Sequence, residues 1–138
     1  MRKPFVAGNW KMNKTGAEAR ALVAELVPEL QTVVSVDRAL CPPYPYLMAV
    51  SAMLSGTGIG LGAQNLYWEE SGAYTGEVSP AMVAEFCQYV IIGHSERRAY
   101  FGETDETVNR KVKAAFAHPL TPIMCVGETL DENESGRT

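Results

Sequence analysis

The sequence has 138 residues, of which 46% are hydrophobic and 20% are charged, and its formal net charge is -4. This composition predicts one globular, soluble domain over residues 1–138. The negative charge disfavours nucleic acid and anionic membranes as partners, and no apolar run is long enough to span a membrane. Three widely spaced cysteines, Cys41, Cys87 and Cys125, favour reduced thiols in a cytoplasmic protein over disulfides or a zinc site.

The first half of the chain alternates between apolar and amphipathic segments. Strands are predicted over Phe5–Trp10, Val36–Leu40 and Ile59–Ala63. From Thr15 onward, apolar residues recur at helical spacing, and we expect that helix to kink or end at Pro28. Prolines 42, 43 and 45 start the next helical element, because proline is tolerated in a first helical turn. We expect Met48, Met53 and, further on, Met82 to be core residues.

The second half repeats this alternation. After a long polar loop, Ser79 caps a short helix that leads to a strand over Tyr89–Ile92. Thr104 caps a longer helix that His118-Pro119 ends, and Ile123–Val126 is the last predicted strand. Alternating β and α units imply parallel strands, arranged as an open doubly wound sheet or as a (β/α)8 barrel. A barrel needs about 250 residues, so this chain would supply the first five strands and four βα units.

In both architectures, functional sites lie at the carboxyl ends of the strands, where this sequence places polar residues. Asn9 and Lys11 are two residues apart, so an extended backbone would turn both side chains the same way. A lysine held there offers a compact charge to a small anion, although spacing alone favours an ordinary solvated lysine. Other polar residues at predicted strand ends are Gln64, Asn65, His94, Ser95, Glu96, Arg98 and Glu128.

His94 follows Gly93 and opens a helical turn. The free N–H groups of such a turn disfavour an imidazolium, and a neutral imidazole can still donate to a carbonyl oxygen that gains negative charge. A histidine satisfied within the core is an equally good interpretation of the pattern. Glu96 is either a base or the partner of Lys11 or an arginine, and pairing is the commoner role for such a carboxylate. The glycines of Gly58–Ala63 match GxGxxA but lie before or within a strand, so they indicate close packing rather than a dinucleotide site.

Several blocks together resemble the N-terminal part of the triosephosphate isomerase family, from Phe5 to about Leu130. They are GNWKMN from Gly8, GAQN from Gly62, AYTGEVS from Ala73 and GHSERR from Gly93. The resemblance implies a (β/α)8 barrel and a homodimer. It also implies cofactor-free interconversion of dihydroxyacetone phosphate and glyceraldehyde 3-phosphate through an enediolate, a step of glycolysis and gluconeogenesis. This family is itself the standard example of a neutral histidine electrophile at a helix start.

Carried over by position, the resemblance makes His94 the electrophile, while Asn9 and Lys11 bind the substrate and Glu96 orients its neighbours. The loop from Gln64 to Ser79 would cross the subunit interface at Thr75. The remaining supporting residues are Gln64, Asn65, Ser95 and Arg98, and no metal is implied.

The family's carboxylate base lies in a later strand-end loop, and the sequence stops at Thr138. We therefore expect this chain to carry the Lys/His half of the site and to be inactive without a complementary C-terminal chain. A nicked, split or truncated enzyme is the favoured explanation. The alternatives are a non-catalytic interaction module and a different phosphate-handling α/β enzyme with an open sheet.

Overall fold

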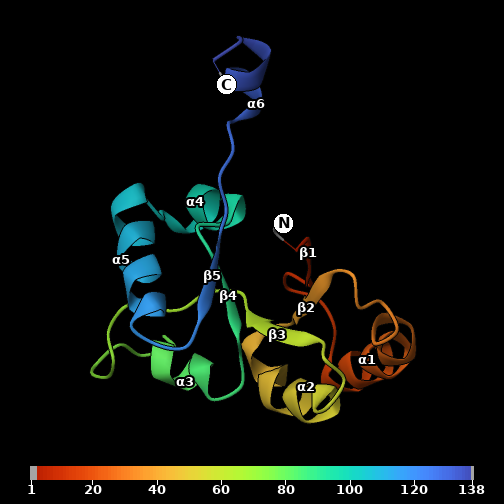
Figure 1. Cartoon of the computed structure of the whole chain (residues 1–138). Helices are drawn as coiled ribbons and strands as arrows, with labels where there is room; N and C mark the ends of the chain where they lie inside the picture. The colour runs from red at the N-terminus through yellow and green to blue at the C-terminus, as the bar shows by residue number, and fades with distance from the viewer. Residues whose placement is uncertain (1–2, 138) are drawn as a thin grey trace.

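The computed structural model describes residues 3–137 and contains one sheet of five parallel strands. The strand order follows the chain order, β1-β2-β3-β4-β5, as in a barrel and unlike a doubly wound sheet. The strands are β1 (Phe5–Asn9), β2 (Asp37–Cys41), β3 (Gly60–Ala63), β4 (Tyr89–Ile92) and β5 (Thr121–Met124). The sheet curls into part of a (β/α)8 barrel (Figure 1), which confirms the predicted fold class.

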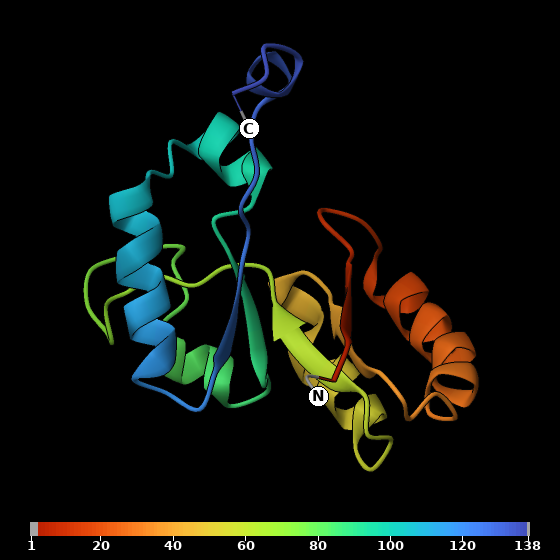
Figure 2. The ribbon, with the colours of Figure 1, turned by 45° about the horizontal axis from the view of Figure 1, so that its top comes forward.

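Helices cover the outer face of this curled sheet, and the inner face is open (Figures 1 and 2). The helices of the chain are α1 (Gly16–Leu30), η1 (Tyr44–Tyr46), α2 (Leu47–Leu54), α3 (Pro80–Ala84), α4 (Ser95–Phe101), α5 (Asp105–Phe116) and α6 (Leu130–Glu134), of which α6 lies away from the sheet. Thr15 and Glu18 form a capping box at α1, and the Ser79 and Thr104 side chains accept backbone N–H groups at α3 and α5. Such caps each stabilise a helix by about 1 kcal/mol.

Side chains along the strands point alternately toward the helices, where the core lies, and toward the inner face of the curled sheet. Leu61 and Ala63 of β3 join the buried cluster beneath the helices. On the inner side, the rings of Phe5 and Tyr89 lie 4.8 Å apart, although β1 and β4 are not neighbours in the sheet. A Cβ at Gly60 would stand 2.6 Å from the Tyr89 ring, so only glycine fits beneath it. A Cβ at Gly62 would stand 2.7 Å from Cys41 Sγ, and Gly58 has a φ of 72° in the turn before β3. The interpretation of these glycines as turn and close-packing residues is confirmed.

Four details of the structure differ from the sequence prediction. Strand β5 begins at Thr121, two residues earlier than predicted, because Pro122 is tolerated at the edge of a sheet. Helix α1 ends at Leu30 rather than at Pro28, and a kink at Pro28 stays a prediction. Met48 and Met82 are 68% and 54% exposed, since they lie on the outer sides of their short helices. Helix α6 was not predicted, because its apolar pattern is absent and only its Thr129–Glu132 capping box marks it.

Both edges of the sheet are open. Within residues 3–137, no strand pairs with the outer edge of β1 or of β5. Val6 and Met124, on these edge strands, and Val126, beyond β5, are 63%, 53% and 82% exposed. Beyond β5 the chain extends away from the sheet and ends in α6, which stands apart from the other helices (Figure 1).

Candidate active site

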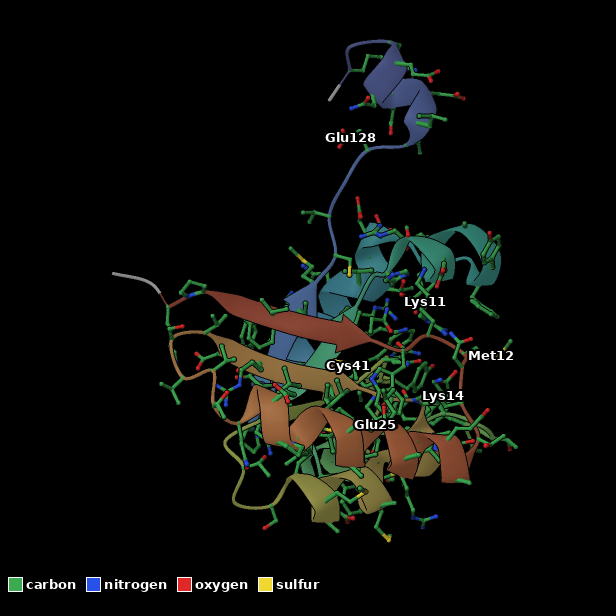
Figure 3. All side chains as sticks on the ribbon, turned by 90° about the vertical axis from the view of Figure 1, so that its right-hand side faces the viewer. Lys11, Met12, Lys14, Glu25, Cys41 and Glu128 are labelled. Atoms are coloured by element: carbon green, nitrogen blue, oxygen red, sulfur yellow. The ribbon has the colours of Figure 1, made fainter. Side chains whose placement is uncertain are left out.

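Polar side chains from three strand ends meet in a pocket of about 330 Å³. Asn9 ends β1, Gln64 follows β3 and His94 follows β4, and these line the pocket together with Lys11 and Glu96. Figure 3 shows Lys11 beyond the carboxyl end of β1 and near α4, with Met12 and Lys14 further along the same loop. The structure therefore brings the predicted substrate-binding and catalytic residues to one place.

The backbone at Lys11 is not extended, as the spacing argument had assumed. Its φ is 54°, in the left-handed region that costs an ordinary residue energy. The Lys11 N–H donates to Asn9 Oδ1 at 3.0 Å, and the Lys11 carbonyl accepts from Gln64 Nε2 at 2.9 Å. The same Gln64 nitrogen donates to the carbonyl of Cys41 at 2.8 Å. Two amide side chains thus hold Lys11 in this conformation and position its side chain.

The ammonium of Lys11 faces Glu96. Lys11 Nζ donates to Glu96 Oε1 at 2.5 Å, and this hydrogen bond holds the pKa of Glu96 below its ordinary value. The side chains are 50% and 41% exposed, so the pair adds little to folding stability. Glu96 is therefore a paired carboxylate, as the sequence favoured, and its lowered pKa makes it a weak base.

His94 is the N-cap of α4, and its ring orientation is fixed by the turn itself. The backbone N–H of Glu96 donates to His94 Nδ1 at 3.2 Å. Because Nδ1 accepts this hydrogen bond, it carries no hydrogen of its own, and the N–H of a neutral ring is on Nε2. Glu96 Oε2 lies 3.5 Å from Nδ1, too far for a good hydrogen bond. Lys11 and His94 thus converge on one carboxylate, and each has a donor available to a ligand oxygen.

The other predicted supporting residues do not all lie at the pocket. Arg98 donates to the carbonyl of Gly93 at 3.0 Å and to Asp105 Oδ1 at 2.7 Å, which fixes the turn that carries His94. Ser95 is exposed and lines a separate hollow beside Cys125. Thr75 lies in the exposed tip of the loop between β3 and α3, away from the pocket. An interface role for Thr75 stays a prediction.

A buried ion network beneath the pocket was missed by sequence reasoning. Lys111 Nζ donates to Asn65 Oδ1 at 2.8 Å and to Glu103 Oε1, and Arg97 Nε donates to the same Glu103 oxygen at 2.5 Å. Burial raises the pKa of Glu103, but the hydrogen bonds from Lys111 and Arg97 outweigh burial and hold that pKa below its ordinary value. The signal was present, since Lys111 lies between Val108 and Ala115 on the buried face of α5.

Two other features do not compete with this site. A larger hollow of about 470 Å³ lies at the amino ends of the strands, but Asp37 there pairs with Lys3, and Arg38 donates to the carbonyls of Val33, Val36 and Gly58. Glu128, which the sequence placed at a strand end, lies on the segment that leads to α6, away from Lys11 (Figure 3).

Residues 3–137 show neither a membrane-spanning helix nor a cluster of metal-ligating side chains. No helix there has the length and apolar character needed to cross a membrane. In the same part of the chain, no group of three or more histidine, cysteine, aspartate or glutamate side chains is placed to hold a metal ion.

Comparison with known proteins agrees with this geometry. The family model of triosephosphate isomerase matches residues 4–138. A triosephosphate isomerase from Carboxydothermus hydrogenoformans is 60% identical over 139 residues, which cover 100% of this chain and 55% of that protein. One from Dehalococcoides mccartyi is 55% identical over 138 residues, with 100% and 54% covered. The chain thus spans about half the length of these relatives.

The fold is similar as well. The crystal structure of triosephosphate isomerase from Bartonella henselae superposes with a TM-score of 0.85 at 40% sequence identity, covering 99% of this chain and 56% of that chain. The strand order, the convergence of Lys11 and His94 and these matches lead to one conclusion: the chain belongs to the triosephosphate isomerase family.

Proposed function

We propose that this chain supplies the Lys11/His94 half of a triosephosphate isomerase active site, which interconverts dihydroxyacetone phosphate and glyceraldehyde 3-phosphate in glycolysis and gluconeogenesis. The observation that carries the proposal is the convergence of Lys11 and His94 on Glu96 at the carboxyl ends of β1 and β4. A cytoplasmic location fits the three free cysteines.

The proposed roles follow from the contacts of each residue. The ammonium of Lys11, half exposed in the pocket, attracts the phosphate group and stabilises the oxyanion that forms as the substrate loses a carbon-bound proton. The Nε2–H of His94 donates to the substrate oxygens and passes protons between them, which a neutral imidazole with a fixed tautomer can do. Asn9 holds the backbone of Lys11, and Glu96 orients the ammonium.

Proton abstraction needs a further group. Glu96 is the one carboxylate among the described residues that line the pocket, and its bond to Lys11 makes it a poor base. We place the base in the part of the family's chain that this match leaves uncovered. The open edges of β1 and β5 are where a complementary chain with the remaining strands would pair. The homodimer contact is proposed for the exposed tip of the loop between Gln64 and Ser79.

The alternative is a non-catalytic interaction module, which the exposed loop tip and open edges would also serve. A complementation assay separates the two. The 138-residue chain is assayed for isomerase turnover alone and after mixing with the unmatched C-terminal part of the Carboxydothermus relative. We expect no turnover alone and turnover in the mixture.

Variants of the mixture identify the residues responsible. His94→Gln should reduce turnover by about 10²- to 10³-fold, the range for loss of one preorganised donor. Met48→Gln, on the outer side of α2, is the matched control and should leave turnover unchanged. A complex that forms but shows no turnover would favour the interaction module. Full turnover by the isolated chain would contradict the proposal that the base lies outside this chain.

A further inference from the structure

The first half of the loop between β3 and α3 is attached to α5 and to a residue just beyond its end. Asn65 accepts from Lys111 at 2.8 Å, and the guanidinium of Arg110 lies 5.4 Å from the centre of the Trp68 ring. Residues 71–77 are exposed, and the loop projects past α5 in Figures 1 and 2. Helix α5 is therefore the support from which the tip extends.

A third attachment joins the carboxylate of Glu70 to the imidazole of His118. His118 Nε2 lies 2.8 Å from Glu70 Oε1 and 3.1 Å from Glu70 Oε2, so both oxygens face one nitrogen. The His118 side chain is 21% exposed and that of Glu70 is 62% exposed. His118 follows the end of α5, where its N–H donates to the Ala115 carbonyl at 3.1 Å, and the carbonyl end of a helix favours a positive charge.

Other charged groups lie on the elements around this contact. Helix α5 packs against β4 and β5, whose titratable residue is Tyr89, and the Tyr89 ring meets Phe5 on the inner side of the sheet. The charged residues of the loop, of the end of α3 and of the last two turns of α5 are Glu69, Glu70, Glu77, Glu85, Arg110, Lys111 and Lys113, and Lys111 is paired with Glu103.

We infer that the Glu70–His118 contact is a proton-sensitive latch, which holds the loop against α5 more tightly when the imidazole is protonated. An imidazolium makes a charge-assisted hydrogen bond and an ion pair with the carboxylate, whereas a neutral ring makes a single ordinary hydrogen bond. Histidine side chains ordinarily change charge between pH 5 and 8. The consequence, a pH-dependent subunit contact, rests on the proposed function, but the latch does not.

Amide hydrogen exchange of the loop tests the latch. Exchange of residues 69–77 in the full 138-residue chain is measured at pH 6 and pH 8 and corrected for the intrinsic pH dependence of exchange. We expect about threefold more protection at pH 6, the scale of a partly exposed ion pair. Glu70→Gln and His118→Gln should each remove this difference. Glu69→Gln, which removes the neighbouring carboxylate, should keep it.

Protection of the α5 amides checks that each variant is folded. Glu70 is mostly exposed, so Glu70→Gln remains decisive if His118→Gln unfolds. If the isolated chain lacks α5 protection, the same comparison is made in the complex with the complementary chain. An equal pH difference in Glu70→Gln, or none in the unaltered chain, overturns the latch. Hydrogen exchange requires neither isomerase turnover nor a dimer. A negative result would therefore overturn the latch without bearing on the proposed function.

Discussion

Each end of the sheet has a hollow that contains a basic side chain, but the two side chains differ in their hydrogen bonds and exposure. At the amino end, a hollow of about 470 Å³ contains Arg38, whose guanidinium donates to three backbone carbonyls. At the carboxyl end, a smaller pocket of about 330 Å³ contains Lys11, whose ammonium is half exposed. An exposed ammonium, rather than the size of a hollow, distinguishes the carboxyl end, where the candidate site lies.

The backbone shows the same contrast. The turn that leads into β3 reaches positive φ at Gly56 and Gly58, where such a conformation costs little. The loop after β1 reaches positive φ at Lys11 and Lys14, which are not glycines. Strain of this kind persists where surrounding bonds hold it, and at Lys11 the side chains of Asn9 and Gln64 supply those bonds.

The largest expected effect comes from the ion network under the carboxyl end. Lys111→Met should lower the free energy of unfolding by about 3–5 kcal/mol, because it leaves the buried acceptor of Asn65 without its partner and weakens the pairing of Glu103. Denaturant titration measures this change. Lys113→Met, on the exposed side of α5, is the control and should shift stability by less than about 0.5 kcal/mol. Equal effects of the two changes would contradict the network.

Removing the cation at the carboxyl end should affect activity rather than folding. Lys11→Met in the complex with a complementary chain should reduce kcat/KM by about 10²- to 10³-fold, because one preorganised charge is lost from the developing oxyanion. Its stability should stay within about 1 kcal/mol, since the Lys11–Glu96 pair is exposed. A coupled isomerase assay and a denaturant titration on the same sample check both parts. Retained turnover would contradict the role of Lys11.

Removing the cation at the amino end should do the reverse. Arg38→Met should lower the free energy of unfolding by about 1–3 kcal/mol, because carbonyls of the turns before β2 and β3 lose their donor. The kcat/KM of the complex should not change. Thermal unfolding measures the first effect and the coupled assay the second. If Arg38→Met lowered kcat/KM without lowering stability, the amino end rather than the carboxyl end would be the one that matters for activity.

Acid should destabilise the carboxyl end through Glu103. The pKa of Glu103 is lower in the folded chain than in the unfolded chain, so its contribution to stability is present above about pH 4.3 and is lost as the pH falls through the lowered folded value. We therefore expect the free energy of unfolding to fall more steeply below about pH 4 in the unaltered chain than in Glu103→Gln. Parallel pH profiles would mean that Glu103 is not the group responsible.

The smallest expected effect tests backbone strain. Lys14 has a φ of 78°, and Lys14→Gly should raise the free energy of unfolding by about 0.5–1 kcal/mol because glycine adopts this conformation freely. Lys14→Ala keeps the Cβ and should give no such gain. The two variants are compared by thermal unfolding, and equal stability would show that the left-handed conformation carries no cost.

The sequence was sufficient for features that depend on local pattern. Helical spacing from Ala19 to Leu30 and the caps at Ser79 and Thr104 placed the helices, because each signal lies within a few residues of its effect. The blocks around Lys11 and His94 indicated the candidate site. Their convergence on Glu96 followed from parallel strands having their carboxyl ends on one side.

Features that depend on distant partners could not be predicted in this way. The left-handed turn at Lys11 is held by Gln64, 53 positions away, and nothing near Lys11 in the sequence signals it. The position of Lys111 on a buried face was a usable signal, but its partners Asn65 and Glu103 come from other parts of the fold. Strand β5 includes Pro122, which the sequence does not predict, because whether a strand lies at an edge is a property of the whole sheet.

Titration with a phosphorylated enediolate analogue tests the central claim most directly. Amide and side-chain NMR signals are followed after this chain is mixed with the unmatched C-terminal part of the Carboxydothermus relative. We expect saturable shifts at Lys11 and at the Nε2–H of His94, with Arg38 of the amino-end hollow unmoved. Shifts confined to Arg38, or an analogue that leaves Lys11 and His94 unchanged at saturation, would contradict the proposed site.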